Sequence, residues 1–187
     1  DIMLRETLRL SRLIDDMLEL SRLQGGTISF APHPFRLNQL VHDLFIQFQQ
    51  RAAQSEITLM ADEGRLQTCP DVFADQDRIE QVLVILLDNA FKFTDAGGSI
   101  SLDCDWDADQ VRVHVQDTGC GIDSKDIDHV FDRFYKADKS HHLPGTGLGL
   151  SIAREILVRS GEQITVRSTL GQGTVFTFTL RRALPDR

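Results

Sequence analysis

Apolar residues recur every three or four positions over the first 23 residues, and charged residues fill the positions between them. This spacing predicts one amphipathic helix, which the pair Gly25–Gly26 ends. The apolar stripe is wide, so the helix is expected to bury that face against partner helices in a bundle. The sequence supplies only one helix of such a bundle.

Strand-like and helix-like patterns interleave in the rest of the chain, and the last strands come in hairpins. They predict an α/β (α+β) two-layer sandwich, in which helices cover one face of a mixed, mostly antiparallel sheet, preceded by the long amphipathic helix. A capping-box pattern at Asp123 predicts a short helix to Phe131, and residues 132–146 have no strong period and are a candidate mobile lid. The other predicted strands are 27–31, 57–61, 72–74, 99–103, 111–117, 163–168 and 174–180, and the helices are 37–54, 76–93 and 147–160.

Composition narrows the class of protein. The 187 residues are 41% apolar and 26% charged, which suits one core and an appended helix. The formal net charge is −8 with mixed signs, so a nucleic-acid partner is not expected. Cys69, Cys104 and Cys120 lack zinc-site spacing and are interpreted as reduced cytosolic thiols. The apolar runs are short, so this segment is expected to make no membrane contact.

The predicted helix 76–93 carries a second, mostly polar stripe that includes Ile85, Asn89 and Lys92. Asparagine is a poor residue for the middle of a helix, and here it lies three residues before a lysine. An amide oxygen could ligate a metal ion, and the ammonium could meet a phosphate. The alternative is a plain solvated face.

Two glycine-containing segments suggest a nucleotide site. Asp117 stands at a predicted strand end before Gly119 and Gly121, where its carboxylate could accept a hydrogen bond from an exocyclic amine such as that of adenine. A tight turn would use the same glycines. The segment 145–150 (GTGLGL) runs into a helix, whose N-terminus can hold phosphate, and it fits neither a Walker loop nor the Rossmann fingerprint.

The order of these motifs resembles the catalytic and ATP-binding domain of sensor histidine kinases, a branch of the superfamily of gyrase and mismatch-repair ATPases. Residues 77–83 and 88–94 resemble the N box, 131–135 the F box, and 117–122, 145–150 and 171–174 the three glycine boxes. Residues 12–23 resemble the second helix of the dimerisation and phospho-acceptor hairpin. The implied domains are a truncated hairpin helix (1–25), the ATP-binding catalytic domain (27–181) and a tail (182–187).

The resemblance implies a role for each matched residue. Asn89 would ligate Mg²⁺, Lys92 and Lys136 would meet the phosphates, and Asp117 would bind the adenine amine. Thr174 would help Asp117 to hold a water molecule beside adenine. The remaining residues implied to bind ATP are Phe93, Gly119, Gly121, Ile122, Phe131, Tyr135, Gly145, Thr146, Gly147, Leu148, Gly149 and Leu150.

The chain departs from the family pattern at three places. Ile85 stands where many of these kinases have asparagine and the hydrolytic relatives have a water-activating glutamate, and Phe93 replaces a common tyrosine. Residues 160–162 replace the usual His-Gly-Gly, which we interpret as turn chemistry. None of the six histidines carries the phospho-acceptor motif, so the acceptor is expected to precede residue 1.

The resemblance therefore implies ATP and Mg²⁺ as ligands, and transfer of the γ-phosphate to a histidine on an upstream helix. The intact protein would be a homodimer through its hairpin and would pass phosphate to an aspartate on a response-regulator receiver domain. The segment would be the cytoplasmic domain of a parent attached to the cell membrane. The alternatives are a gyrase-type or mismatch-repair-type ATPase, an anti-sigma serine kinase and a nucleotide-binding module without catalysis; Ile85 disfavours the ATPase, because hydrolysis needs an activated water.

Overall fold

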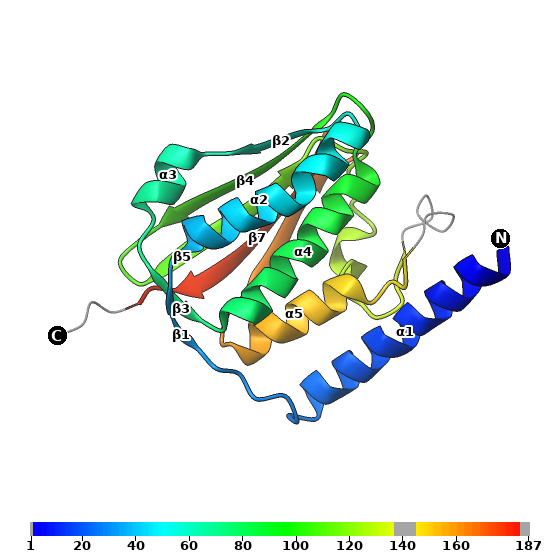
Figure 1. The fold of residues 1–187 in the computed structure, drawn as a ribbon, viewed down its shortest axis with the longest axis horizontal. Helices are drawn as coiled ribbons and strands as arrows, with labels where there is room; N and C mark the ends of the chain where they lie inside the picture. The colour runs from blue at the N-terminus through cyan, green and yellow to red at the C-terminus, as the bar shows by residue number, and fades with distance from the viewer. Residues whose placement is uncertain (1, 137–144, 184–187) are drawn as a thin grey trace.

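A five-stranded sheet forms the centre of the molecule (Figure 1). The computed structural model describes residues 2–136 and 145–183. The strand order is β2–β4–β5–β7–β6, with β2 parallel to β4 and all other neighbours antiparallel. The predicted mixed, mostly antiparallel sheet is thereby confirmed. The strands are β2 (Thr58–Ala61), β4 (Ser99–Trp106), β5 (Gln110–Asp117), β6 (Ile164–Thr169) and β7 (Gly173–Arg181).

Three helices cover one face of this sheet: α2 (Leu37–Gln54), α4 (Gln76–Phe93) and α5 (Gly149–Arg159) (Figure 1). Side chains alternate along the central strands, so every second residue enters the core under these helices. Each fully buried aliphatic or aromatic side chain contributes about 1.5–3 kcal/mol. The buried strand residues are Ile100, Leu102, Cys104, Val111, Val113, Val115, Phe176, Phe178 and Leu180.

The smaller elements join the edges of the sheet to the helices. Strands β1 (His33–Phe35) and β3 (Val72–Ala74) pair antiparallel as a separate two-stranded sheet. A short helix, α3 (Glu63–Thr68), follows β2, and a single 3₁₀ turn, η1 (Ile127–His129), follows the first glycine box. The Asp75 side chain caps α4 by accepting the Arg78 N–H.

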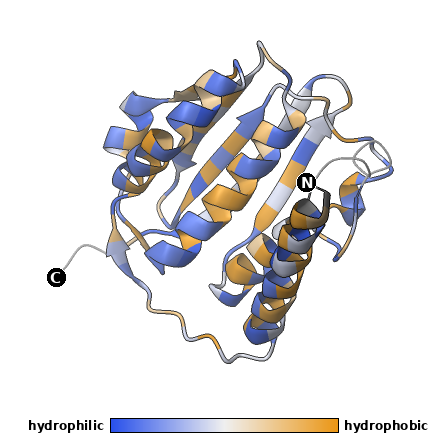
Figure 2. Ribbon diagram, turned by 45° about the vertical axis from the view of Figure 1, so that its right-hand side comes forward, coloured by the Kyte–Doolittle hydropathy of each residue, from blue (hydrophilic) through white to orange (hydrophobic). Residues whose placement is uncertain are grey.

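The first helix, α1 (Ile2–Gln24), lies along the outside of α5 (Figures 1 and 2). Its C-terminal part is anchored, because Leu20 and Leu23 are buried and the Arg159 guanidinium donates to the Leu23 carbonyl. Gly26 has a φ of 69°, a left-handed conformation that ends the helix as its sequence predicted. No helix among residues 2–136 and 145–183 is long and apolar enough to cross a membrane.

The structure corrects four sequence predictions. Residues 27–31 are not a strand; the strand is His33–Phe35, because β3 pairs with that segment. The helix α3 was not predicted, since six residues are too few to show a period. The expected helix 123–131 is a turn and one 3₁₀ turn, and the last helix begins at Gly149 rather than residue 147, because Gly147 has a φ of 77°.

Candidate nucleotide site

The polar stripe of α4 faces the N-terminus of α5. The Asn89 side-chain amide donates to the Ile85 carbonyl at 3.1 Å, which leaves its oxygen on the opposite side of the amide group. A Cβ on Gly149 would lie 3.4 Å from a methyl group of Ile85. Ile85 therefore packs under the beginning of α5, and its side chain provides an apolar contact where the ATPases have a glutamate.

Lys92 brings the N box and the second glycine box together. Its ammonium lies 4.7 Å from the centre of the Phe93 ring, and a Cβ on Gly145 would come within 3.2 Å of it. Burial lowers the pKa of Lys92 below its ordinary value, and the positive charge of Lys136 lowers it further. Two ammonium groups thus act on the same region, which favours an anionic ligand there.

Asp117 ends β5 as a buried carboxylate that is only 6% exposed. The Gly119 N–H donates to its Oδ1 at 2.8 Å, and the Thr174 N–H also bonds to the carboxylate. Burial raises the pKa of Asp117 above its ordinary value, whereas these two hydrogen bonds oppose the shift. A buried acceptor held by backbone donors can recognise an amine on a flat base.

The glycines of the boxes allow backbone segments to lie against each other. A Cβ on Gly119 would be 2.2 Å from the Phe93 carbonyl oxygen, and one on Gly121 would be 2.1 Å from that of Thr169. Gly121 and Gly173 also have positive φ values of 68° and 111°. Any side chain at these positions would separate the end of α4, the first glycine box and the β6–β7 turn.

Ser168 is a residue that sequence reasoning missed. Its hydroxyl donates to the Gly173 carbonyl at 2.7 Å, accepts the Ile122 N–H at 2.8 Å and lies 2.9 Å from the Thr174 hydroxyl. It therefore connects the first and third glycine boxes under Asp117. A lone serine in a strand gives no sequence signal, because only the register of β6 against β7 places it there.

The F box contacts β7, the segment that follows the first glycine box, and the second glycine box. Phe131 packs edge-on against Phe176 of β7, with ring centres 6.1 Å apart. The Tyr135 hydroxyl donates to the buried carboxylate of Asp126 at 2.6 Å. This bond explains why Asp126 does not close the expected capping box. The Phe134 N–H donates to the Gly147 carbonyl at 3.0 Å, so the F box and the second glycine box are hydrogen-bonded.

The second glycine box leads directly into α5. Leu148 is fully buried and Leu150 partly buried, which anchors the loop on the core. The Thr146 hydroxyl accepts the Leu148 N–H at 3.3 Å and donates to Asp16 of α1 at 2.6 Å. Among the described residues no side chain caps α5, so its first N–H groups can meet an anion.

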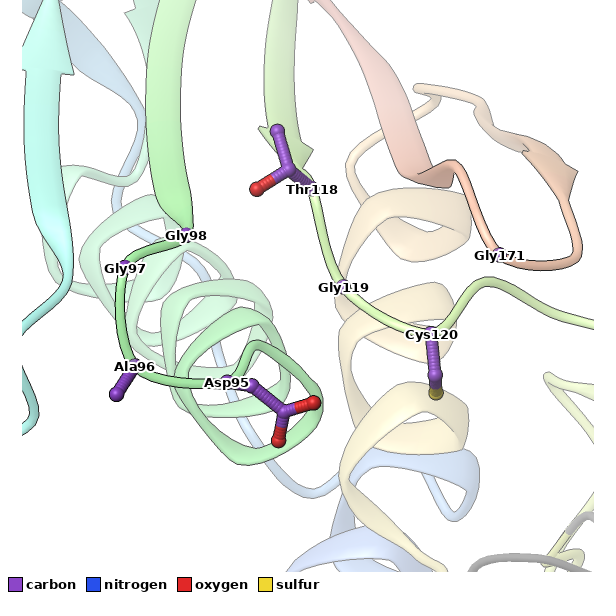
Figure 3. A pocket seen from close by; sticks show the side chains of 8 residues that line it. All are labelled: Asp95, Ala96, Gly97, Gly98, Thr118, Gly119, Cys120 and Gly171. Atoms are coloured by element: carbon purple, nitrogen blue, oxygen red, sulfur yellow. The ribbon is translucent and has the colours of Figure 1, made fainter.

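Thr94 carries a buried hydroxyl at the opposite end of the site. The residue is 7% exposed, and its Oγ1 has no hydrogen-bond partner within the described part of the chain. The α4–β4 loop and the first glycine box meet nearby around a recess of about 470 Å³ (Figure 3). The recess is lined by Asp95, Ala96, Gly97, Gly98, Thr118, Gly119, Cys120 and Gly171.

Most of the residues expected to bind nucleotide lie on the loops and helix ends between α4, β5, β7 and α5, together with Lys136 after the F box. The candidate lid extends through residues 137–144, which include His141 and His142 and lie outside the described residues. The other four histidines are described, and His114 bonds to Asp105 and Thr177 on the uncovered face of the sheet, away from the helices.

Comparison with known proteins agrees with this arrangement. Residues 74–184 match the family model for histidine kinase-, DNA gyrase B- and HSP90-like ATPases. The circadian input-output histidine kinase CikA of Synechococcus elongatus is 37% identical over 171 residues, covering 90% of this chain and 22% of the relative. The sensor protein SrrB of Staphylococcus aureus is 33% identical over 181 residues, which cover 96% of this chain and 30% of SrrB. The chain thus spans less than a third of these relatives.

Solved structures show the same fold. Full-length ShkA in complex with AMPPNP superposes with a TM-score of 0.84 at 29% identity, over 97% of this chain and 38% of that one. Histidine kinase ThkA in complex with the response regulator TrrA gives a TM-score of 0.76 at 27% identity. The match covers 100% of this chain and 51% of that one. The chain therefore belongs to the histidine kinase-, DNA gyrase B- and HSP90-like ATPases, and within them it carries the catalytic ATP-binding domain of the sensor histidine kinases.

Proposed function

We propose that the chain binds Mg-ATP between α4, the glycine boxes and the start of α5, and that the whole protein transfers the γ-phosphate to one of its histidines. The placement of Lys92 beside Gly145 is the observation that carries this proposal. An ammonium group thus lies next to the loop that leads into α5, a helix whose N-terminus no side chain of the described residues caps, and both features attract phosphate.

The residues fit an adenine nucleotide at both ends of the site. Asp117 offers a buried acceptor to an exocyclic amine, and the Thr94 hydroxyl, which has no partner among the described residues, lies near the same end. At the phosphate end, Lys92 and Lys136 supply positive charge, and the F box supports the loop through Phe134. These groups bind and orient the substrate, which is the main contribution a protein makes to phosphoryl transfer.

Magnesium would be held through Asn89. No group of three or more His, Cys, Asp or Glu side chains that could hold a metal occurs among residues 2–136 and 145–183. A single amide oxygen together with phosphate oxygens suits Mg²⁺, which is commonly bound through few protein ligands. The ion would neutralise phosphate charge, and Asn89 would fix its position.

The domain division and the partners are part of the same proposal. Residues 1–25 would be a helix of the dimerisation and phospho-acceptor hairpin, 27–181 the catalytic domain and 182–187 a tail. The whole protein would be a homodimer with a receiver domain as its partner. This segment would lie in the cytoplasm, and its parent would be attached to the membrane. The structure of ThkA with its response regulator supports the partner class by similarity.

The test is ATP binding and transfer. Asn89→Ala should reduce nucleotide affinity in Mg²⁺ and leave the Mg²⁺-free affinity nearly unchanged, because alanine has no oxygen ligand. Asn38→Ala on α2 makes the same change away from the site and is the matched control. With a purified acceptor hairpin of the same protein added, labelled ATP should yield acid-labile phosphohistidine. No labelled hairpin, or an unchanged Mg²⁺ dependence in Asn89→Ala, would contradict the proposal.

A further inference from the structure

An ion pair joins the last turns of α2 and α4, which lie side by side on the sheet (Figure 1). The Arg51 guanidinium of α2 donates a hydrogen bond to the Asp88 carboxylate of α4. The two side chains are 42% and 54% exposed, so the pair by itself adds little to stability. Its importance therefore depends on what the Asp88 carboxylate would do without it.

Two aromatic rings hold the Arg51 guanidinium in place. Its central carbon lies 4.8 Å from the centre of the Phe91 ring and 5.8 Å from that of the Phe48 ring. The two rings are stacked on each other with centres 5.5 Å apart, and both are buried. A guanidinium is attracted to aromatic faces, which restricts its movement. Arg51 is thus a fixed cation beside Asp88.

Asp88 stands one helical turn before Lys92. Side chains four residues apart lie on the same side of a helix, and an acid placed before a lysine is the favourable order for attraction. In the structure the Lys92 ammonium instead lies 4.7 Å from the centre of the Phe93 ring, and a Cβ on Gly145 would come within 3.2 Å of it. Among the described residues no ion pair joins Asp88 to Lys92; the carboxylate is paired with Arg51.

We propose that Arg51 is a positioning residue for phosphate binding, because it holds the Asp88 carboxylate and so leaves the Lys92 ammonium directed at the second glycine box. This inference rests on the proposed function, in which Lys92 meets the phosphates. The charge state of the lysine agrees with it. Burial and Lys136 lower the pKa of Lys92, whereas a carboxylate acting on the ammonium would raise that pKa.

Arg51→Met tests the proposal, because methionine keeps an apolar stem against the two rings but has no charge. Asp88 should then pair with Lys92. The affinity for ATP should fall about two- to fivefold, which corresponds to one partly exposed charge pair. The pKa of Lys92 in the nucleotide-free protein should rise, as measured by NMR of isotope-labelled lysine side chains. Loss of packing alone would not raise that pKa.

A second substitution separates the carboxylate from the packing of Arg51. Asp88→Asn has no charge to offer Lys92, so Arg51→Met combined with Asp88→Asn should match Asp88→Asn alone in ATP affinity and in the pKa of Lys92. Arg65→Met is the matched control. It removes the comparably exposed ion pair between α3 and Asp103 of β4, and it should leave ATP affinity unchanged.

The proposal is overturned if Arg51→Met leaves either the ATP affinity or the pKa of Lys92 as in the natural protein. It is also overturned if the combined variant binds ATP as weakly as Arg51→Met. Lys92→Met tests the proposed function separately. Natural ATP affinity in Lys92→Met would overturn both proposals, whereas a loss there with no change in Arg51→Met would overturn only the role of Arg51.

Discussion

A carboxylate buried as deeply as Asp117 opposes folding at neutral pH, and we propose that it is retained because it binds adenine. Its folded pKa is raised, so the native state binds more protons than the unfolded state between the two pKa values. Its contribution to stability is therefore fully present below the unfolded pKa and is lost as pH rises through the folded pKa. At neutral pH Asp117 is a destabilising residue that the site retains.

We predict that Asp117→Asn raises the melting temperature at pH 7, and that this advantage shrinks as the pH falls through the Asp117 titration. The same change should reduce ATP affinity about ten- to a hundredfold, since an unpaired buried polar group costs about 1–3 kcal/mol. The preference for ATP over GTP should shrink as well, because an amide can offer a donor or an acceptor.

Parallel titrations of ATP and GTP test the binding effects, and melts from about pH 3, below the ordinary aspartate pKa of about 3.9, to about pH 8 test the stability effect. Asp109→Asn, an exposed residue in the β4–β5 turn, is the control for loss of one charge. Equal binding of both nucleotides by the natural protein would exclude adenine recognition by Asp117.

Gly121 and Gly171 allow backbone strain and steric clash to be distinguished. Both have positive φ, of 68° and 79°, but a Cβ at Gly121 would lie 2.1 Å from the Thr169 carbonyl oxygen, whereas nothing lies within 4 Å of one at Gly171. Gly171→Ala should cost about 1–2 kcal/mol, the usual price of the left-handed conformation. Gly121→Ala should cost clearly more and should weaken ATP binding. Chemical denaturation measures the loss of stability in each variant. Equal losses would show that the close approach of Gly121 to the Thr169 carbonyl is unimportant.

At the scale of elements, α1 contacts two boxes of the site. Asp16 accepts the Thr146 hydroxyl, and Glu19 accepts from Arg78 and Gln81 at the start of α4. A carboxylate of α1 held against the second glycine box, where we propose that phosphate binds, should repel phosphate. Asp16→Asn should therefore tighten ATP binding about two- to fivefold, since one partly screened charge is worth under about 1 kcal/mol.

Asp15→Asn provides the control for this effect, because Asp15 is the exposed neighbour on the same helix. Calorimetry at low and high salt should show the difference between the two variants and its reduction by screening. A tightening that is the same in both variants would assign the effect to net charge rather than to the Thr146 contact.

The elements also show what the sequence could predict. Helices α2 and α4 were predicted with the observed bounds, because each carries many turns of periodic apolar residues and α4 has Asp75 as a side-chain cap. The strand expected at 27–31 was wrong, because only pairing with β3 selects residues 33–35. The roles of Ser168 and Thr94 depend on strand register and burial, which no local pattern records.

At the scale of the whole molecule, α1 leaves an apolar surface uncovered. Leu20 and Leu23 pack on the catalytic body, but the preceding part of the helix exposes large apolar side chains. A row of exposed apolar side chains of this length is unusual on a monomer and is typical of an interface. Its members are Met3, Leu4, Leu8, Leu10, Ile14, Met17 and Leu18.

We predict that the chain, extended upstream to include the acceptor helix, dimerises through this row. Ile14→Glu should shift the extended chain to monomer, because a charge would be buried in the bundle. Ile46→Glu on α2 is the matched control, since Ile46 is 59% exposed and Ile14 49%, and it should leave the dimer intact. Sedimentation velocity measures the shift, and ATP titration checks that the nucleotide site is unchanged. If both variants sediment as the natural dimer does, the row on α1 is not the dimer contact. If only Ile14→Glu is monomeric and it still binds ATP, dimerisation and nucleotide binding belong to separate parts of the chain.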